Sequence, residues 1–290
     1  MATFIGLIMN SKCQQTLINR TVSSYKKINH QDRDGMIIDN QNSIRKEIIE
    51  ARRPPFWHME SISCQYAMKG FCLIETGGVS PEALRFLNLS FMYKEVAQEI
   101  EFNENKNSVC IQLEHVRRCL FKLAPLLLWS ILIGNKSLAK KIRNQFLFYL
   151  NLKNVTRNLH LDYELFCLWL YESWVEEKSD TIQNISGDFK QLIDHWYADA
   201  EKLQEIVISI CDFHCEEMVD NQKKPALPRF MSPPCDLIPL EIHVINKLRQ
   251  SHSLSRLIVD HPITNTNIAI VSEFSIVEDD FLEYIQINIF

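Results

Sequence analysis

The sequence predicts an all-α protein of antiparallel helical hairpins, packed as a bundle or a short curved array, with a short extended carboxy-terminal segment. Apolar residues recur at steps of three and four through most of the chain, the spacing of one face of an α-helix. Only 7 of the 290 residues are glycine, which leaves few of the tight turns that antiparallel sheets use. Helix starts predicted about 25–35 residues apart suit paired helices.

Composition and length fit one large domain or two small ones. Hydrophobic residues make up 46% and charged residues 23%, as in globular proteins with a sizeable core. We predict an amino-terminal helical extension over residues 1–57 and a main helical domain over 58–290, with a loop at 221–235. Within the extension, helices are expected over 13–28 and 43–52, and the Pro54–Pro55 pair should end the second.

The clearest helix boundary lies at residues 77–81. Gly77 and Gly78 can end one helix in a left-handed cap, and Ser80 can cap the next, with Pro81 at its first position. The following segment, 108–134, carries one long apolar stripe, and Pro125 should kink or split it.

Three further helical segments follow in order. Residues 136–150 predict a helix after a short Gly134–Asn135 link, and residues 162–178 predict another, with its glutamates facing outward. Residues 186–220 predict one helix, or two with a break near Ala198.

The carboxy-terminal quarter begins with a proline-rich loop. Four prolines lie within 221–235, and the stretch DLIPLEIHVINKL then predicts a last core helix over 240–248, which should end in SHSLS. We expect Ile238, Leu240, Ile242, Ile245 and Leu248 to close the core, with Glu241 favoured near the helix start by the helix dipole. His261–Pro262 should end the packing, and the alternating run 264–277 predicts a short strand or an extended arm.

Cysteine usage and apolar runs predict a cytoplasmic protein. The nine cysteines are scattered, mostly in apolar helical segments, which is typical of reduced thiols used as small hydrophobes. The apolar run 4–9 lacks a basic flank and is shorter than a signal core, although a cryptic signal within residues 1–9 stays open. The longest uncharged run, 123–135, falls short of the ~20 residues of a membrane span.

No motif for catalysis stands out, so we predict no enzyme, no catalytic residue, no cofactor and no metal. Cys211, His214 and Cys215 could offer three zinc ligands on one helix face, but a fourth ligand is not apparent nearby. Buried thiols beside a hydrogen-bonded histidine are the favoured interpretation. Ser-x-x-Lys occurs three times, and Walker and G-x-S-x-G motifs are missing. An unrecognised enzyme with metal at the Cys211 cluster remains the third alternative.

Charge is divided unevenly along the chain. Residues 1–153 hold 21 Lys and Arg against 13 Asp and Glu, a net charge of +8; residues 154–290 hold 10 against 23, a net charge of −13. Such polarity can steer a charged partner toward one half. Basic residues cluster at 52–53, 117–118 and 136–143, but the chain is net acidic, so neither direct nucleic-acid binding nor membrane binding is predicted.

The acidic half also carries many aromatic residues, and aromatic anchors beside carboxylates suit a basic protein partner. One buried ring among solvated acids is an equally weighted interpretation. The residues predicted to bind a partner, chosen by charge and expected exposure, are Glu172, Glu176, Asp194, Tyr197, Asp199, Glu201, Asp212 and Glu216.

LIPLEIHVINKL, a polar gap and a final DHPI together resemble the carboxy-terminal end of helical immunity proteins from bacterial polymorphic-toxin and type VI secretion systems. LIDHWYADA is similar to a Trp-Tyr helix of the nuclease-immunity group, whereas Pro233–Pro234–Cys235 stands where that group has a glycine-aromatic signature. The resemblance implies an all-α inhibitor that binds and neutralises a cognate toxin, expected to be basic, such as a nuclease, without chemistry of its own. A helical scaffold or a secreted effector that binds other proteins is the alternative.

Overall fold

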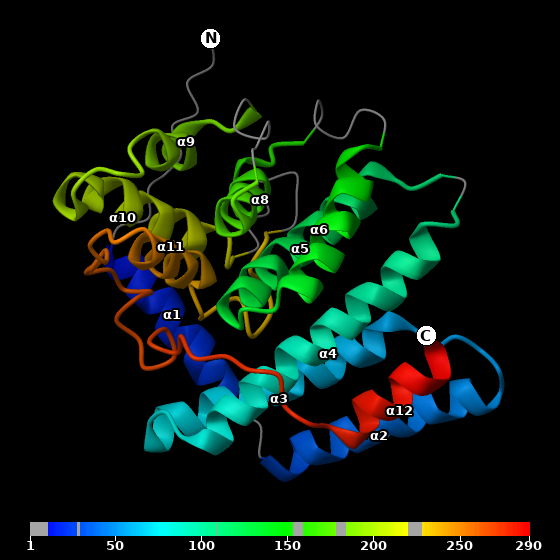
Figure 1. Ribbon diagram of the computed structural model, residues 1–290. Helices are drawn as coiled ribbons and strands as arrows, with labels where there is room; N and C mark the ends of the chain where they lie inside the picture. The colour runs from blue at the N-terminus through cyan, green and yellow to red at the C-terminus, as the bar shows by residue number, and fades with distance from the viewer. Residues whose placement is uncertain (1–10, 28–29, 109, 153–158, 178–183, 220–227) are drawn as a thin grey trace.

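The structure is a computed structural model that describes residues 11–27, 30–108, 110–152, 159–177, 184–219 and 228–290 (Figure 1). Within these ranges the chain forms helices and no strand, so the all-α prediction is confirmed. The helices are α1 (Ser11–Lys26), α2 (His30–Ile49), α3 (Phe56–Gly77), α4 (Pro81–Asn105), α5 (Leu113–Leu132), α6 (Lys136–Leu150), α8 (Asp162–Val175), α9 (Gly187–Asp194), α10 (Ala200–Glu216), α11 (Leu240–Ser251) and α12 (Asp280–Ile289).

Helices α3 and α4 form a long hairpin whose turn follows the predicted capping. Gly78 adopts a positive φ of 79°, and the backbone N–H of Ala83 donates to the Ser80 hydroxyl at 3.2 Å, with Pro81 at the first helical position. Close approach of the two helices requires Gly70, because a Cβ there would lie 2.9 Å from the Leu87 side chain. The predicted boundary at residues 77–81 is therefore confirmed.

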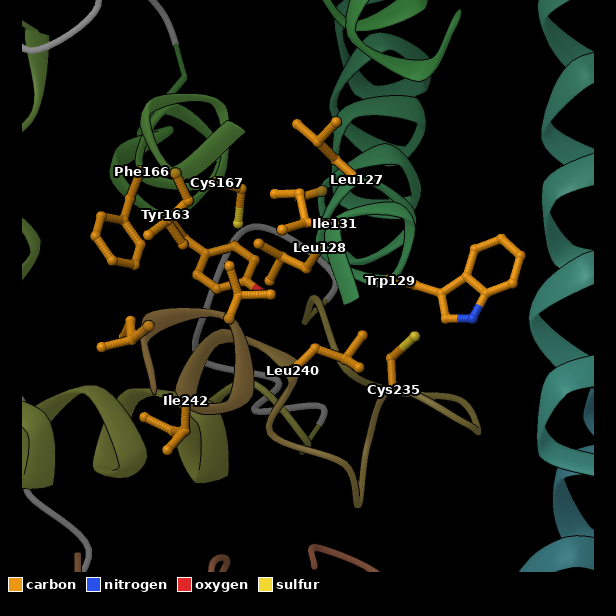
Figure 2. Packing of buried hydrophobic residues seen from close by; sticks show 14 of the residues in the cluster. Leu127, Leu128, Trp129, Ile131, Tyr163, Phe166, Cys167, Cys235, Leu240 and Ile242 are labelled. Carbon is orange, nitrogen blue, oxygen red and sulfur yellow. The ribbon is translucent and has the colours of Figure 1, made fainter. Parts of the chain in front are cut away.

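Helix α5 is the centre of the molecule. Every residue from Leu123 to Leu132 is buried, because α4, α6, α8 and α11 contact this helix from different sides. Leu128 and Ile131 point toward α8 and α11, whereas Trp129 points away from them (Figure 2) and stacks on Phe91 of α4 with ring centroids 5.5 Å apart. The helix runs through Pro125 without being split.

The stretch Asp236–Leu248 closes this central core, as the sequence predicts. Ile238, Leu240, Ile242, Ile245 and Leu248 are all buried. Helix α11 ends at Ser251, at the start of SHSLS. Glu241 lies in the first turn as expected, but it is 1% exposed and contacts His214. Residue spacing within one helix could not reveal this buried partner on another helix.

The expectation that His261–Pro262 frees the tail is wrong. Ile263, Ile268 and Val271 are buried in the central core, since the apolar side chains after the turn still find a surface to cover. Of the run 264–277 predicted as a strand or an extended arm, residues 264–270 form turns and a bend instead, and residues 271–279 run without helix or strand.

A second, smaller core lies under α12, a helix that the sequence analysis did not predict. Asp279 caps it by accepting from the Leu282 N–H at 2.9 Å, and Phe281, Leu282 and Ile285 are buried beside α2 (Figure 1). This second core also includes Ile37 and Ile44 of α2 and residues of α3 and α4.

Helices elsewhere differ from the predictions mainly at their ends. Helix α1 matches the helix predicted over 13–28, but α2 begins at His30, well before the predicted start at residue 43. Its mean hydropathy is low and its apolar face is narrow, which concealed the first half of the helix. The predicted break near Ala198 is confirmed by the gap between α9 and α10. In the described part of the chain, no helix has the length and apolar character to cross a membrane.

The irregular segment 228–239 is tied to the helices by Arg229. Its guanidinium donates to Glu164 of α8 at 2.6 Å and to Glu217 at 3.0 Å, and also to the backbone oxygen of His160 at 2.9 Å. Only 11% of the Arg229 side chain is exposed, and that of Glu164 not at all. These partners hold the loop against the central core.

Replacing Arg229 should therefore destabilise the fold strongly. Arg229→Met leaves two buried carboxylates without their cation, so we expect the free energy of unfolding to fall by about 3–5 kcal/mol in urea denaturation. Arg256→Met, on an exposed arginine, is the matched control. Equal unfolding free energies for the two variants would contradict this role.

Candidate functional site

The turn between α9 and α10, residues 195–199, divides two neighbouring aromatic side chains between the core and the surface. Trp196 is buried, meets Trp169 edge to face with centroids 5.0 Å apart, and donates its Nε1–H to His252 at 3.3 Å. Tyr197 is 75% exposed. The structure thus contains both features weighed from the sequence, a buried ring and an exposed aromatic among acids.

Arg249 of α11 holds this turn in place through hydrogen bonds to its backbone. Its buried guanidinium donates to the backbone oxygens of Trp196 and Ala198, the latter at 3.0 Å, and its Nε–H donates to Ser255 O at 3.0 Å. Beyond the end of α9 these backbone oxygens have no helical N–H to accept from, and the charged guanidinium donates to them instead. Tyr197 is consequently presented on a braced turn rather than on a loose loop.

Three predicted acids that flank Tyr197 in the sequence are exposed: Asp194, Asp199 and Glu201. Asp194 pairs with Lys190 one helical turn earlier, and Asp199 lies 3.6 Å from the Lys202 ammonium. Both pairs are solvent-exposed and therefore weak. We call Asp194, Tyr197, Asp199 and Glu201 the acidic patch.

Helix α10 extends the acidic patch along one face. At 100° per residue, Glu201, Glu205, Asp212 and Glu216 fall within about 60° of one another around the helix. Glu205 is exposed, and the sequence analysis missed it. Its position four residues after Glu201 was the signal that could have found it.

Two predicted residues at the far end of this face, Asp212 and Glu216, are half-buried. Asp212 accepts from the Gln14 amide of α1 and contacts His261 Nε2 at 3.1 Å. Asp212 therefore joins α10 to α1 and to the carboxy-terminal segment.

The expectation that Glu172 faces solvent is wrong, whereas Glu176 is exposed. Glu172 is 6% exposed, because α8 is covered by α5, α6, α9 and α11. Glu176 ends α8 in a left-handed conformation with φ 59° and lies apart in sequence from the turn that carries Tyr197. Asp194, Tyr197, Asp199 and Glu201 are thus exposed on the α9–α10 turn and the helix ends next to it, whereas Glu172 is buried.

The Cys211–His214–Cys215 cluster is a core element, as the favoured interpretation predicted. His214 Nδ1 lies 2.7 Å from Glu241 Oε1, and Nε2 lies 3.1 Å from the backbone oxygen of Asp236. Burial opposes the imidazolium charge, but Glu241 outweighs it and raises the pKa of His214 above its ordinary value. Burial also raises the pKa of both thiols, that of Cys215 to about 12.

Asp236 extends this buried polar network to α1. Its carboxyl group accepts from the Tyr25 hydroxyl, and burial raises the pKa of Asp236 to about 6. His214, Glu241, Asp236 and Tyr25 thus join α10, α11 and α1 through polar contacts inside the core. Such a network fixes one packing arrangement when its members are satisfied.

A cavity of about 350 Å³ opens between α3, α4, α5 and the 228–235 segment. Its lining is basic, but Lys122 pairs with Glu60 at 2.7 Å and Arg229 pairs with Glu164. Burial raises the pKa of the two lining thiols, Cys64 and Cys235, the latter to about 12. Both are protonated at neutral pH, which is unsuited to nucleophilic chemistry.

Several of the basic residues singled out in the sequence are paired with nearby acids. Lys141 lies 2.5 Å from Glu95 and 3.0 Å from Glu99, and Arg117 lies 2.8 Å from Glu114. Neutralisation at short range reduces the field that these particular residues project.

No protein-family model, curated protein or solved structure matches the chain.

The buried network predicts how stability changes with pH. The folded-state pKa of Asp236, about 6, lies above the ordinary 3.8, so its contribution is fully present below 3.8 and is lost as the pH rises through 6. Asp236→Asn removes this titration while keeping an oxygen for Tyr25. From pH 4 to pH 7 we expect the unfolding free energy of the variant to rise relative to that of the wild type by about 2 kcal/mol.

Urea denaturation at each pH measures this difference. Glu273→Gln, on an exposed carboxylate, should follow the wild type throughout. A constant gap between Asp236→Asn and the wild type from pH 4 to pH 7 would contradict the buried, titrating carboxyl.

Proposed function

We propose that this chain is an immunity-type protein that binds and neutralises a cognate antibacterial toxin through the acidic patch. The observation that carries the proposal is Tyr197, a 75% exposed aromatic side chain among Asp194, Asp199 and Glu201 on a turn braced by Arg249. The resemblance of the final helix and the DHPI turn to helical immunity proteins supports the same function.

The patch has the physical composition of a binding hot spot. Tyrosine offers a large contact area with few torsions to restrict, and it is enriched where truncation weakens protein complexes most. Arg249 satisfies the backbone oxygens of the turn before any partner arrives, which lowers the entropy cost of ordering it. The anchor is thus set in place in the free protein.

The surrounding carboxylates select for a positively charged partner. Asp194, Asp199 and Glu201 contribute to a carboxy-terminal half, residues 154–290, whose net charge is −13. Complementary charge speeds encounter and penalises wrong partners more than it adds raw affinity. A basic toxin, such as a nuclease with a cationic substrate cleft, is the partner that this surface fits.

The helical-scaffold or secreted-effector alternative would use the same kind of surface with a different partner. The two are separated by the product of the neighbouring gene: a toxin that this chain inhibits supports the immunity function. Purified neighbouring-gene product and this chain should form a complex in which the toxin loses its activity. A toxic product that is neither bound nor inhibited would overturn the proposal.

Electrostatic steering is tested with that complex by stopped-flow association. Reversing the charge of Asp194, Asp199 and Glu201 to lysine should lower the association rate by about tenfold or more at low ionic strength, because these charges guide encounter. The wild-type rate should fall as salt screens them. Glu82→Lys, on an exposed residue of α4, should leave the rate within about twofold. A salt-independent wild-type rate is inconsistent with steering.

The anchor role of Tyr197 is tested in the same system through the dissociation rate. Tyr197→Ala should weaken binding by about 2 kcal/mol or more, roughly thirtyfold, mainly through faster dissociation. Trp57→Ala removes another exposed aromatic side chain, 58% accessible on α3, and serves as the matched control. If both substitutions have the same effect on the dissociation rate, Tyr197 is not the anchor.

A further inference from the structure

Three side chains of mixed ligand type meet between α4 and α5, away from the acidic patch. Glu101 comes from α4, and His115 and Cys119 lie one turn apart on α5. Their ligand atoms all lie within 4.8 Å of one another, and Glu101 Oε1 is 3.7 Å from His115 Nε2. Helical i, i+4 spacing places the imidazole and the thiol on the same face. The sequence signal is H-x-x-x-C in HVRRC, a pattern that was not among the predicted sites.

Glu101 supplies an independent indication that a ligand belongs here. Its side chain is 2% exposed, and Oε2 accepts from the Lys122 ammonium at 2.9 Å. Oε1 is buried without a hydrogen-bond partner among the described residues. A buried carboxylate oxygen without a donor is costly, and this one lies toward the histidine and the thiol.

We propose that Glu101, His115 and Cys119 bind one zinc-class divalent transition-metal ion. Carboxylate oxygen, imidazole nitrogen and thiolate sulfur are the donors that zinc takes, and three protein ligands leave a fourth position for water. Tetrahedral bonds of about 2.0–2.3 Å place ligand atoms roughly 3.3–3.7 Å apart. The three side chains therefore draw together by about 1 Å, and the Asn105 amide, now 2.8 Å from His115 Nε2, moves aside.

Protonation changes accompany binding. Zinc binds a neutral imidazole and a thiolate, so as the sulfur–metal bond forms the Cys119 thiol proton is released to solvent. Binding through Nε2 leaves the remaining ring proton on Nδ1. The exposed Arg118, which now contacts Nδ1 at 2.9 Å, then turns toward solvent.

Nearby cations limit the affinity without closing the site. Lys122 faces Glu101 but is also paired with Glu60 at 2.7 Å, so its charge is shared between two carboxylates. A shallow cavity lined in part by Asn105, Gln112, His115 and Arg118 gives the ion a path from solvent. The bound ion would link α4 to α5 next to the central core. This structural role does not depend on the proposed toxin partner.

Titration of the metal-free, reduced full-length chain with Zn²⁺ alone tests the site. Calorimetry should show one ion per chain with proton release, and Co²⁺ should give thiolate-to-metal charge-transfer absorption. Cys119→Ser should abolish that absorption. Cys119→Ser and His115→Gln should each weaken Zn²⁺ binding at least tenfold. His115 is half-buried, so its variant remains informative if Cys119→Ser does not fold, with circular dichroism as the check.

Matched controls exclude capture by exposed thiols. Cys13→Ser and Cys110→Ser remove exposed cysteines and should keep both the stoichiometry and the absorption of the wild type. The proposal is overturned by absence of binding, by unchanged affinity in His115→Gln, or by loss of binding in Cys110→Ser. None of these outcomes depends on whether the acidic patch binds a toxin.

Discussion

Complete burial of the second half of α5 is the constraint on which the rest of the fold depends. A ten-residue stretch that is apolar except for Ser130, whose hydroxyl donates to the Leu127 backbone oxygen, cannot lie on a surface, so other helices must enclose it. α4, α6, α8 and α11 do so. The irregular segment 228–239 and α11 close the last open side, which explains why Ile238, Leu240 and Ile245 are buried in a region whose chain is otherwise broken by prolines.

Enclosure of α5 also buries polar side chains, and several of them pair with one another or with the backbone. Glu164 and Glu217 share Arg229, while His214 lies between Glu241 and the backbone of Asp236. These contacts join helices distant in sequence. Because an uncompensated buried charge costs several kcal/mol, such contacts restrict the helices to one arrangement more than they raise stability.

The same principle links the core to the proposed binding surface. Arg249, buried on α11, reaches the backbone oxygens of the α9–α10 turn, so the residue that braces Tyr197 belongs to the helix that closes the core. Trp196 is buried through its contacts with Trp169 and His252, and the next residue, Tyr197, consequently faces solvent. Partner recognition, as proposed, would use a surface whose shape is set by internal packing, whereas Asp212 is engaged in joining α10 to α1.

Local signals in the sequence determined the helical class, the α3–α4 boundary at Gly78–Ser80–Pro81, the break near Ala198 and the apolar residues of α11, because capping, turn chemistry and spacing act over a few residues. The start of α2 was decided by tertiary packing, since this helix covers the second core with few apolar residues of its own. Helix α12, in contrast, carries local signals that the sequence analysis overlooked: the Asp279 cap and apolar residues at helical spacing, Phe281, Leu282, Ile285 and Ile289. Spacing placed Asp194, Tyr197, Asp199 and Glu201 near one another, but only the packed structure buried Glu172 and Trp196 and exposed Tyr197. Exposure depends on which helices cover a side chain, and that is fixed by contacts between residues far apart in the chain.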